Sequence, residues 1–430
     1  MNKEIAERIK MIKEGNVPEG YRKSVVGMIP TEWTIKKLSQ YIISLSNGIS
    51  VNAGDRSATK DEIGILKTSS VTINGFRPNK NKVVINDEDI IKLKIYPQKD
   101  NLIIVRKNTP ELVGMVNYID KDYKNLFLPD LLWQTIFKQE CNINKKYIYY
   151  FLNTNYYNKL IKTLATGSSK SMPNIRKENL LNISICIPSS KEQDKITNIL
   201  SKFDRLIELK EKLLKEKQKQ KKGLMERLLS GKVRLNGFDE ELKTVKLRTL
   251  MKERNEIGYN DLELLAITSA NGVVRRTEVN VKDNSSEDKS KYKRILPGDI
   301  GYNTMRMWQG VSGLSKYEGI VSPAYTILKP TEKIDSEFMS YLFKLPQVVN
   351  LFHRYSQGLV SDTLNLKYEN FKGIKVTIPT EIEEQKQIAN ILSISDKEIK
   401  ILKKEIEELK KQKKGLMQLL LTGIVRVKCD

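Results

Sequence analysis

One segment occurs twice in this chain of 430 residues, and the repetition constrains the fold more than any other feature. The first copy reads KKGLMERLLSGKVRL (221–235) and the second reads KKGLMQLLLTGIVRV (413–427), 192 positions later. The offset of 192 holds from Gln193 to Arg234 and becomes 191 just upstream of that stretch. Self-similarity over such a distance predicts two half-molecules, each a variable globular part followed by a repeated segment.

The repeated segment has the pattern of a long amphipathic helix. Its apolar residues recur at steps of three, four or seven, which predicts a stripe close to a coiled-coil seam. Pro188 and Pro379 precede the two segments, and glycines at 231 and 423 stand where a left-handed C-terminal cap belongs. Each helix would cover about 35 residues, or about 50 Å. Since neither helix could bury its stripe alone, we expect an antiparallel pair; two helices packed separately on their own domains are the alternative.

Apolar positions of the stripe, together with two glycines, are predicted to form the helix pair and its interface with partner proteins. They are Ile196, Leu200, Phe203, Leu206, Gly223, Leu224, Ile388, Leu392, Ile399, Leu402, Gly415 and Leu416. A glycine inside a helix costs about 1 kcal/mol relative to alanine. Gly223 and Gly415 occupy the same place in the two copies, which predicts that another backbone approaches closely there.

The parts between the repeats have mixed patterns. Short apolar runs such as NLIIVRK (101–107) and GIKVTIP (373–379) are typical of strands, and the longer runs 145–165 and 336–355 are typical of helices. The predicted class is α+β, with two globular domains separated by two long helices in a pseudo-twofold repeat. The predicted segments are 1–28 (N-terminal helix and linker), 29–188 (first domain), 189–235 (central helical region), 236–379 (second domain) and 380–430 (C-terminal helical region).

The chain is strongly basic, with 75 Lys and Arg against 52 Asp and Glu and a net charge of +23. Such a surplus favours a polyanionic partner, of which nucleic acid is the commonest. A lysine-rich composition without such a partner explains the number equally well. The run KEKQKQKK (215–222) is interpreted mainly as a solvated helix face, with contact to phosphate or to an acidic partner as the alternative.

Cysteine and histidine are too few for a metal site. Cys141, Cys186 and Cys429 are scattered and form no CxxC pair, and His353 is the sole histidine. We therefore expect no metal, no disulfide and a structural role for His353. The first residues lack the apolar core of a signal peptide, and no apolar run approaches 18 residues, so a cytoplasmic protein without membrane contact is expected.

Several motifs together resemble one family. They are the opening GMIPTEWTIKKL (27–38) and the closings IPSSKEQDKITNIL (187–200) and IPTEIEEQKQIANIL (378–392), each closing followed by KKGLM and LL(S/T)GxVR. Over nearly its full length the chain resembles the DNA-specificity (S) subunit of type I restriction–modification systems. One departure is Leu242 in FDEELKTVKL, which stands where the first opening has Trp33, so the packing at the second entry is expected to differ.

The resemblance implies a division of labour. Each variable part would be a target recognition domain for one half of a bipartite site in double-stranded DNA, and the helices would be a ruler and a docking surface for two modification (methyltransferase) subunits. S-adenosylmethionine is then expected in the modification subunit, with no cofactor in this chain, and restriction subunits are expected as further partners. Half-sites on one face of B-DNA lie about 34 Å apart, a distance that a helix pair can span.

No catalytic site is expected in the chain itself. It contains no Asn-Pro-Pro-aromatic tetrapeptide, no GxGxxG and no GxxxxGK(S/T). Pro129-Asp130 could open a nuclease motif, but Glu140-Cys141-Asn142 lacks the completing lysine, so a turn is predicted. Three alternatives stay open: an enzyme with an unrecognised motif, a basic coiled-coil scaffold that binds nucleic acid without sequence preference, and an S-like subunit of a different methyltransferase or nuclease.

Residues that contact DNA are predicted from side-chain chemistry. Arg and Lys read guanine, Asn and Gln read adenine, Ser and Thr read either, and lysines mostly hold phosphates. The predicted residues are Lys67, Thr68, Ser69, Ser70, Arg106, Ser168, Ser169 and Lys170 in the first part, and Thr268, Ser269, Arg275, Arg276, Arg306, Trp308, Gln309, Gln357 and Ser361 in the second. The alternative for each is an ordinary polar loop or strand-edge residue, and for Trp308 a core position.

Overall fold

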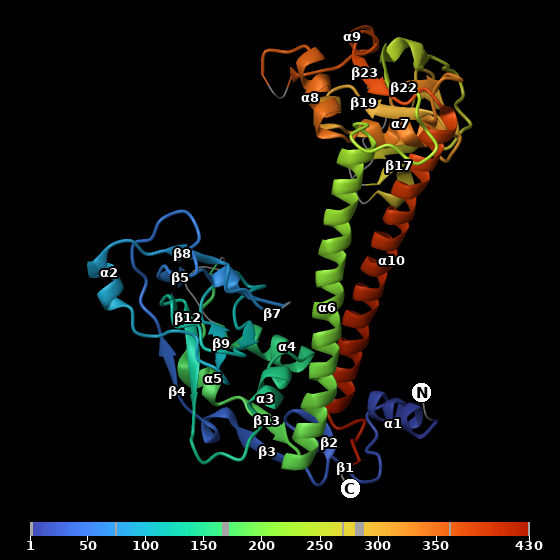
Figure 1. Ribbon diagram of the computed structural model, residues 1–430. Helices are drawn as coiled ribbons and strands as arrows, with labels where there is room; N and C mark the ends of the chain where they lie inside the picture. The colour runs from blue at the N-terminus through green and yellow to red at the C-terminus, as the bar shows by residue number, and fades with distance from the viewer. Residues whose placement is uncertain are drawn as a thin grey trace. The chain divides into compact units, whose positions relative to one another are not determined.

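The computed structural model describes residues 3–73, 75–165, 172–268, 271–279, 288–360 and 363–428 (Figure 1). The chain forms two compact units that are interleaved in sequence. Unit 1 consists of residues 1–209 and 406–430, and unit 2 consists of residues 210–405. Both boundaries fall inside long helices, so each unit holds one globular part and portions of both long helices. The domain boundaries drawn from the sequence divide the chain differently and stay predictions.

Unit 1 begins with a helix and a hairpin, α1 (Lys3–Lys13), β1 (Tyr21–Ser24) and β2 (Gly27–Pro30). The predicted linker therefore becomes a strand in its second half. The Arg8 guanidinium donates to the carbonyl of Ile424 at 2.8 Å. The Tyr21 hydroxyl donates to the carbonyl of Gly423 at 2.7 Å. These bonds join the first residues of the chain to its last turn within unit 1.

A four-stranded antiparallel sheet in the order β10-β9-β12-β4 is the centre of unit 1. Its strands are β4 (Ile42–Asn47), β9 (Leu102–Val105), β10 (Val116–Tyr118) and β12 (Leu132–Phe137). The remaining strands are β3 (Thr34–Lys37), β5 (Gly64–Leu66), β6 (Val71–Thr72), β7 (Gly75–Phe76), β8 (Asn81–Val83), β11 (Leu126–Phe127) and β13 (Ser184–Ile187). The helices are η1 (Leu38–Gln40), η2 (Thr68–Ser70), α2 (Asp87–Lys92), α3 (Lys145–Phe151), α4 (Asn155–Leu164) and α5 (Lys177–Leu181).

Unit 2 repeats this plan with a four-stranded sheet in the order β15-β22-β19-β20. Its strands are β14 (Lys243–Lys246), β15 (Met251–Arg254), β16 (Leu265–Thr268), β17 (Gly272–Arg275), β18 (Lys293–Ile295), β19 (Ile300–Asn303), β20 (Ser312–Leu314), β21 (Gly319–Val321), β22 (Tyr325–Pro330) and β23 (Lys375–Ile378). Its helices are η3 (Leu247–Thr249), η4 (Arg276–Glu278), η5 (Met307–Gln309), α7 (Ser336–Leu342), α8 (Pro346–Tyr355) and α9 (Tyr368–Phe371). The predicted α+β class and internal repeat are confirmed.

Each helix predicted inside a globular part is in fact two helices. In unit 1 the break lies between α3 and α4, where the Thr154 side chain caps α4 by accepting from the Tyr157 amide. In unit 2 it lies between α7 and α8, where Pro346 occupies the first turn of α8. A proline there lacks the N–H that would continue α7 but suits the start of a new helix.

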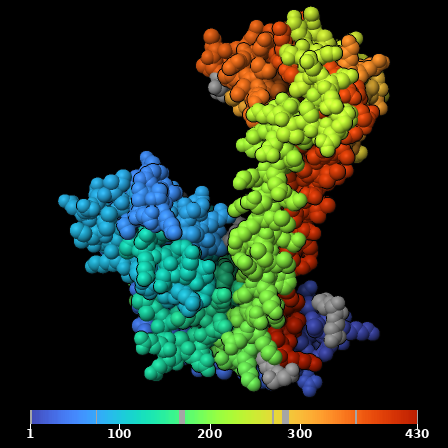
Figure 2. Space-filling view, viewed as in Figure 1, coloured from blue at the N-terminus to red at the C-terminus, as the bar shows by residue number. Residues whose placement is uncertain are grey.

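The repeated segments are two long helices, α6 (Ser190–Leu228) and α10 (Ile382–Leu421), of 39 and 40 residues. Within unit 2, Lys210 pairs with Glu405 and Lys217 with Glu398, both at 2.8 Å, so the residue number on α10 falls as that on α6 rises. The predicted antiparallel pair is confirmed, and the space-filling view shows the side chains of the two helices in contact (Figure 2). After the helices, Gly231 and the glycine at 423 have φ of +71° and +70°, as predicted for left-handed caps.

The seam of the pair differs from the prediction at three positions. A Cβ added at Gly223 or Gly415 would meet nothing within 4 Å, so the predicted close approach of a backbone is wrong, because both glycines point away from the neighbouring helix. Leu206 is 41% exposed, and the adjacent Ile207 is buried in its place. Six of the predicted seam residues are buried, namely Ile196, Leu200, Ile388, Leu392, Ile399 and Leu402, whereas Phe203, Leu224 and Leu416 are half-buried.

The largest hydrophobic core cluster of each unit includes residues from both long helices. In unit 1, Leu200 of α6 and Leu420 of α10 join the core around Trp33. In unit 2, Leu228 of α6 and Leu392 of α10 join the core around Phe371. The start of one helix and the end of the other are therefore part of the largest core cluster of each unit. Among the residues that the structure describes, no helix has the length and apolar character needed to cross a membrane.

Candidate nucleic-acid interface

In each unit, a bidentate ion pair joins a buried glutamate at the start of one long helix to an arginine in the segment that follows the other long helix. In unit 1, Arg426 donates from Nε and Nη2 to the two oxygens of Glu192, at 2.7 and 3.0 Å. In unit 2, Arg234 makes the same two bonds to Glu384, both at 2.8 Å. The carboxylates lie at the starts of α6 and α10 and are only 2% and 0% exposed. We call each of these bidentate contacts an end pair; the offset of 192 relates one to the other.

A second set of contacts ties the globular part of unit 1 to both helices. Tyr150 of α3 donates its hydroxyl to Asp204 of α6 at 2.6 Å. The same carboxylate accepts from Lys413 of α10, whose ammonium also lies 5.4 Å from the centre of the Tyr150 ring. Burial, followed by the charge of Asp204, raises the pKa of Tyr150, so the hydroxyl stays a donor. We call this group a Tyr–Asp–Lys triad.

Unit 2 has the same triad from the equivalent residues. Tyr341 of α7 donates to Asp396 of α10 at 2.9 Å, and Lys221 of α6 donates to Asp396 at 2.6 Å. Lys221 also lies 5.2 Å from the centre of the Tyr341 ring. The two helices exchange roles between the units, because the aspartate is on α6 in unit 1 and on α10 in unit 2. That exchange is the signature of a pseudo-twofold repeat.

The two openings are packed differently, as expected from the departure at position 242. In unit 1 the Trp33 indole N–H donates to Glu192 at 3.1 Å, and a Cβ on the cap glycine at 423 would meet Pro30 and Trp33. In unit 2 the equivalent cap, Gly231, faces Leu242 instead. The apolar side chain fills the place of the indole but offers no donor to Glu384.

The residues predicted to contact DNA in unit 1 are only partly accessible. Ser69 is exposed, Lys67 and Thr68 are half-buried, and Ser70 is buried with its hydroxyl unpartnered. Ser70 could reach DNA only after a rearrangement of η2, and its contact with DNA stays a prediction. Arg106 donates from Nε to Asn174 at 3.2 Å. The prediction for 168–170 falls outside the described residues.

Two predicted residues on the β16–β17 hairpin of unit 2 make internal contacts. Thr268 accepts from the Asn271 amide at 3.0 Å and donates to the Gly272 carbonyl, so it shapes the turn. Arg275 lies 3.6 Å from Glu263 and stacks over the ring of Tyr317. Arg276 follows in η4 and is half-buried. Ser269 lies outside the described residues.

The loop between β19 and β20 presents the most accessible group of predicted residues. Arg306 and Gln309 are exposed, and Trp308 is half-buried, with its indole N–H donating to the Met305 carbonyl at 3.1 Å. The rings of Trp308 and the exposed His353 of α8 make an edge-to-face contact, with 5.8 Å between ring centres. Trp308 is thus not a core residue. Within the described part of the chain Arg306 forms no ion pair, unlike Arg275.

A largely buried lysine donates hydrogen bonds to the backbone at the end of this loop. Lys344, between α7 and α8, donates to the carbonyls of Gly310 and Ser312 at 2.6 and 2.7 Å. Burial lowers the pKa of Lys344 to about 8. In unit 1 the equivalent residue is Asn153, whose amide donates to the Val116 carbonyl at 3.3 Å. The role of Lys344 could not be predicted from the sequence, because a lysine next to an apolar helix usually has its ammonium in solvent.

The turn after α8 lies beside the same loop. Gln357 and Asn365 exchange two backbone hydrogen bonds of 2.8 Å, and the Leu366 amide donates to the Thr304 carbonyl at 2.9 Å. Gln357 is exposed, as a base-reading residue must be. Ser361 lies outside the described residues. The described residues 357–360 and 363–366 therefore lie next to the start of the loop from 304 to 309.

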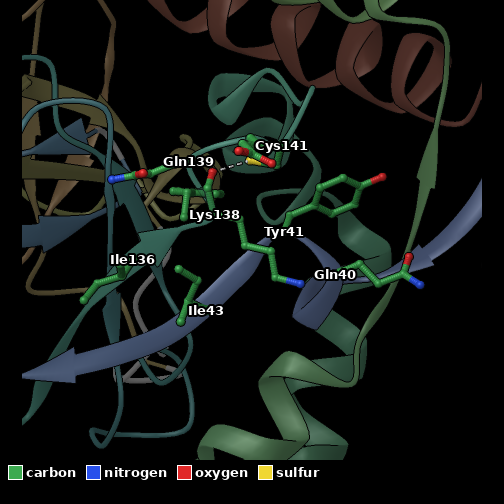
Figure 3. Close-up of a pocket in the computed structure, with 9 residues that line it drawn as sticks. Gln40, Tyr41, Ile43, Ile136, Lys138, Gln139 and Cys141 are labelled. Atoms are coloured by element: carbon green, nitrogen blue, oxygen red, sulfur yellow. Dashed lines mark hydrogen bonds between the residues drawn. The ribbon is translucent and has the colours of Figure 1, made fainter.

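Unit 1 also has a surface hollow of about 570 Å³ beside β4 and β12 (Figure 3). Exposed Ile43 and Ile136 lie at one side of it, and the Cys141 thiol donates to the Lys138 carbonyl at 3.0 Å. None of the residues predicted to contact DNA lines it. Pro129-Asp130 lies in a turn, as predicted, with the Leu132 amide donating to the Pro129 carbonyl at 3.2 Å.

These features define a duplicated chain in which two α+β parts are held on one antiparallel helix pair. The family profile described as the type I restriction modification DNA specificity domain matches residues 30–217 and 255–411. The chain belongs to this family, and the resemblance stated from the sequence is confirmed.

Two relatives and two solved structures place the chain further. The putative type I restriction enzyme MjaX specificity subunit of Methanocaldococcus jannaschii is 24% identical over 428 residues, covering 95% of this chain and 97% of the relative. The MjaVIII specificity subunit of the same organism is 31% identical over 235 residues, about half of each chain. The S subunit from M. genitalium aligns with a TM-score of 0.57 at 16% identity, over 93% and 97% of the two chains. A chain from work on assembly and conformational transition of the type I R-M system aligns with a TM-score of 0.51 at 12% identity, over 92% and 99%. These structures share the fold.

Proposed function

We propose that this chain is the non-catalytic specificity subunit of a type I restriction–modification complex, and that each globular part reads one half of a bipartite site in double-stranded DNA. The observation that carries the proposal is the pair of Tyr–Asp–Lys triads. Identical residues hold two different sheets on the same helices, which suits a frame that carries two unlike readers. Arg306 is exposed and forms no ion pair with any residue that the structure describes. It supports a DNA-facing surface on unit 2, because such a guanidinium can bind phosphate or guanine.

The helix pair is proposed to set the gap between the half-sites. A helix of 39 residues is about 58 Å long, since the rise is 1.5 Å per residue. That length exceeds one turn of B-DNA, about 34 Å, which is the repeat of equivalent groove faces. Inserting four residues, about one helical turn, near Lys215 should alter the gap or abolish assembly. An unchanged gap in an assembled complex would contradict the ruler.

Two modification subunits are proposed to dock on the pair, one for each copy of the repeat. Leu209 of α6 and Ile401 of α10 are equivalent by the offset of 192, and both are exposed. Equivalent apolar positions on opposite helices suit two copies of one partner. Catalysis and S-adenosylmethionine would then belong to that partner, and restriction subunits would join the same complex. L209D and I401D should each lose one modification subunit, measured by native mass spectrometry, with Ile91→Asp on α2 as the exposed control.

Footprinting of the reconstituted modification complex tests the recognition itself. Two short protected base clusters at a fixed separation are expected. Uniform protection along the duplex would favour a scaffold without sequence preference. Methyl transfer by the purified chain alone would contradict the non-catalytic role.

A further inference from the structure

In unit 2, the chain that follows α8 (Figure 1) exposes two adjacent apolar residues, Leu359 and Val360, which we call the apolar tip. The Leu359 side chain is 101% exposed and that of Val360 is 61% exposed. Leucine and valine are among the residues most often buried, and here two of them are exposed side by side in sequence. Two adjacent exposed apolar side chains form a small patch that a partner could cover.

The backbone under this tip is tightly held. Gln357 and Asn365 exchange two backbone bonds, and the Thr363 amide donates to the Val360 carbonyl at 2.9 Å. Gly358 has φ of +145°, and a Cβ there would lie 2.6 Å from the Thr363 carbonyl oxygen. Only glycine fits that position without strain. The exposure of Leu359 is therefore built into the turn.

The surroundings of the tip favour DNA as its partner. Arg306 on the adjoining loop and Arg354 in the last turn of α8 form no ion pair within the described residues. Elsewhere in unit 2, Arg254 and Arg294 are paired with carboxylates. An apolar tip with unpaired cations nearby suits a polyanion that has an apolar interior. Two side chains are also far too small a patch for a stable protein interface, which needs about 800 Å² from each partner.

We propose that Leu359, supported by Val360, is a wedge that inserts between two base pairs of the half-site read by unit 2. The inference rests on the proposed function. Leucine is one of the side chains that enter base steps from the minor groove, unstack them partly and kink the duplex. Pyrimidine–purine steps kink most easily, so the wedge adds sequence preference at a step that no polar group reads. The aligned residues of the first part are Ser168 and Ser169, so the device is expected in one half-site alone.

The test uses the reconstituted modification complex on its target duplex. A fluorescent adenine analogue is placed in turn at each step of both half-sites, and donor and acceptor dyes at the duplex ends report bending. The variants are L359S, which matches the first part, and L359M, which keeps the volume. Ile91→Ser, at a 79% exposed position on α2, is the control.

Wild-type complex should show one unstacked step in the second half-site together with a bend. L359S should abolish both signals and weaken binding about tenfold. It should leave the salt dependence of binding unchanged, since no charge is removed. L359M and Ile91→Ser should behave as wild type. A target base flipped by the modification subunit would instead give a signal in both half-sites that survives L359S.

Three results would overturn the wedge. A normal footprint over both half-sites, with no step whose unstacking depends on Leu359, would leave the proposed function standing and remove the wedge. Loss of a modification subunit from L359S, with DNA signals unchanged, would assign the tip to a protein partner. Absence of a two-cluster footprint with wild-type complex would contradict both proposals.

Discussion

The inner and outer faces of the two globular parts have diverged to very different degrees. At the inner face, where each part contacts the helices, the triads and end pairs use the same residue types in both units. At the outer face, exposed Ile43 and Ile136 of β4 and β12 are replaced in unit 2 by exposed Lys252 and Lys329 of β15 and β22. The triad and end-pair residues that contact the two long helices are of the same types in both units, whereas the exposed residues on these strands differ.

The difference is chemical as well as positional. In unit 1 the two isoleucines line the hollow of Figure 3, together with polar side chains such as Gln40 and Lys138. In unit 2 the matching position carries two positive charges. A partner that touched both outer faces in the same way would not tolerate such a change. The outer faces therefore differ from one unit to the other, whereas the triad and end-pair contacts with the helix pair are the same in both units.

The largest expected effect breaks the end pair of unit 2. Arg234→Ala removes the partner of Glu384, which is fully buried and has no indole donor beside it, so unfolding should become easier by about 3–5 kcal/mol. Arg426→Ala in unit 1 leaves Glu192 with the Trp33 N–H and should cost about 2–3 kcal/mol. Urea unfolding measures both variants. Equal losses in the free energy of unfolding, or a larger loss for Arg426→Ala, would contradict the expected contribution of the Trp33 indole.

A DNA-binding comparison separates exposed from internally paired arginines in unit 2. Arg306→Ala should weaken binding by about 1–3 kcal/mol and reduce the salt slope by about one unit. Arg275→Ala should change the salt slope little, because Glu263 already neutralises that guanidinium. Titration of the reconstituted complex at several salt concentrations checks both. A larger effect from Arg275 would reassign the DNA-facing surface to the β16–β17 hairpin.

The lysine beneath the β19–β20 loop should make stability depend on pH. Its pKa is about 8 in the folded chain and about 10.4 when unfolded, so between these values the unfolded chain holds a proton that the folded chain lacks. The free energy of unfolding should therefore rise with pH across this window, by about 1–2 kcal/mol. Below pH 8 both states are charged and the cost of burial is fully present.

Lys344→Met should remove that rise, measured as the urea midpoint at pH 7.5 and 9.5 relative to wild type. Asn153→Leu is the matched control, because the equivalent residue of unit 1 does not titrate. The same pH slope in Lys344→Met as in wild type would show that another group is responsible.

The smallest effect concerns the triads and tests their equivalence. Tyr150→Phe and Tyr341→Phe each remove one hydrogen bond to a partly exposed aspartate, so each should cost about 1 kcal/mol. The two losses should agree within about 0.5 kcal/mol. Hydrogen exchange in each unit would show where the loss occurs. A clear effect in one unit only would mean that the repeated residues have taken different roles.

Much of the fold could be predicted because its signals are long and repeated. A stripe sustained over a whole helix, with caps at matching glycines, identifies two helices that need each other. The choice between Leu206 and Ile207 could not be made, since adjacent apolar residues fit the period equally and only packing selects one. A glycine repeated in both copies likewise carries no sign of which way it faces, and Gly223 points outward.

The residues of the DNA-binding site were harder to predict, because the residue type alone does not show whether a polar side chain is buried or exposed. Ser70 has the chemistry of a base reader but lies inside the fold, whereas Arg306 has both the chemistry and the exposure. Leu359 was missed for the opposite reason, since an isolated leucine in a sequence is expected in a core. The glycine before it, required by the turn, is the local signal that could have raised the question.

The separate reading of two half-sites is tested most directly by exchanging residues 29–188 for the corresponding part of a related specificity subunit and sequencing the modified bases in the host genome. One half-site should change to the sequence recognised by the related specificity subunit, while the other half-site and the gap between them stay unchanged. Modification sites in which both halves change together, or in which neither does, would contradict the division of reading between the two globular parts.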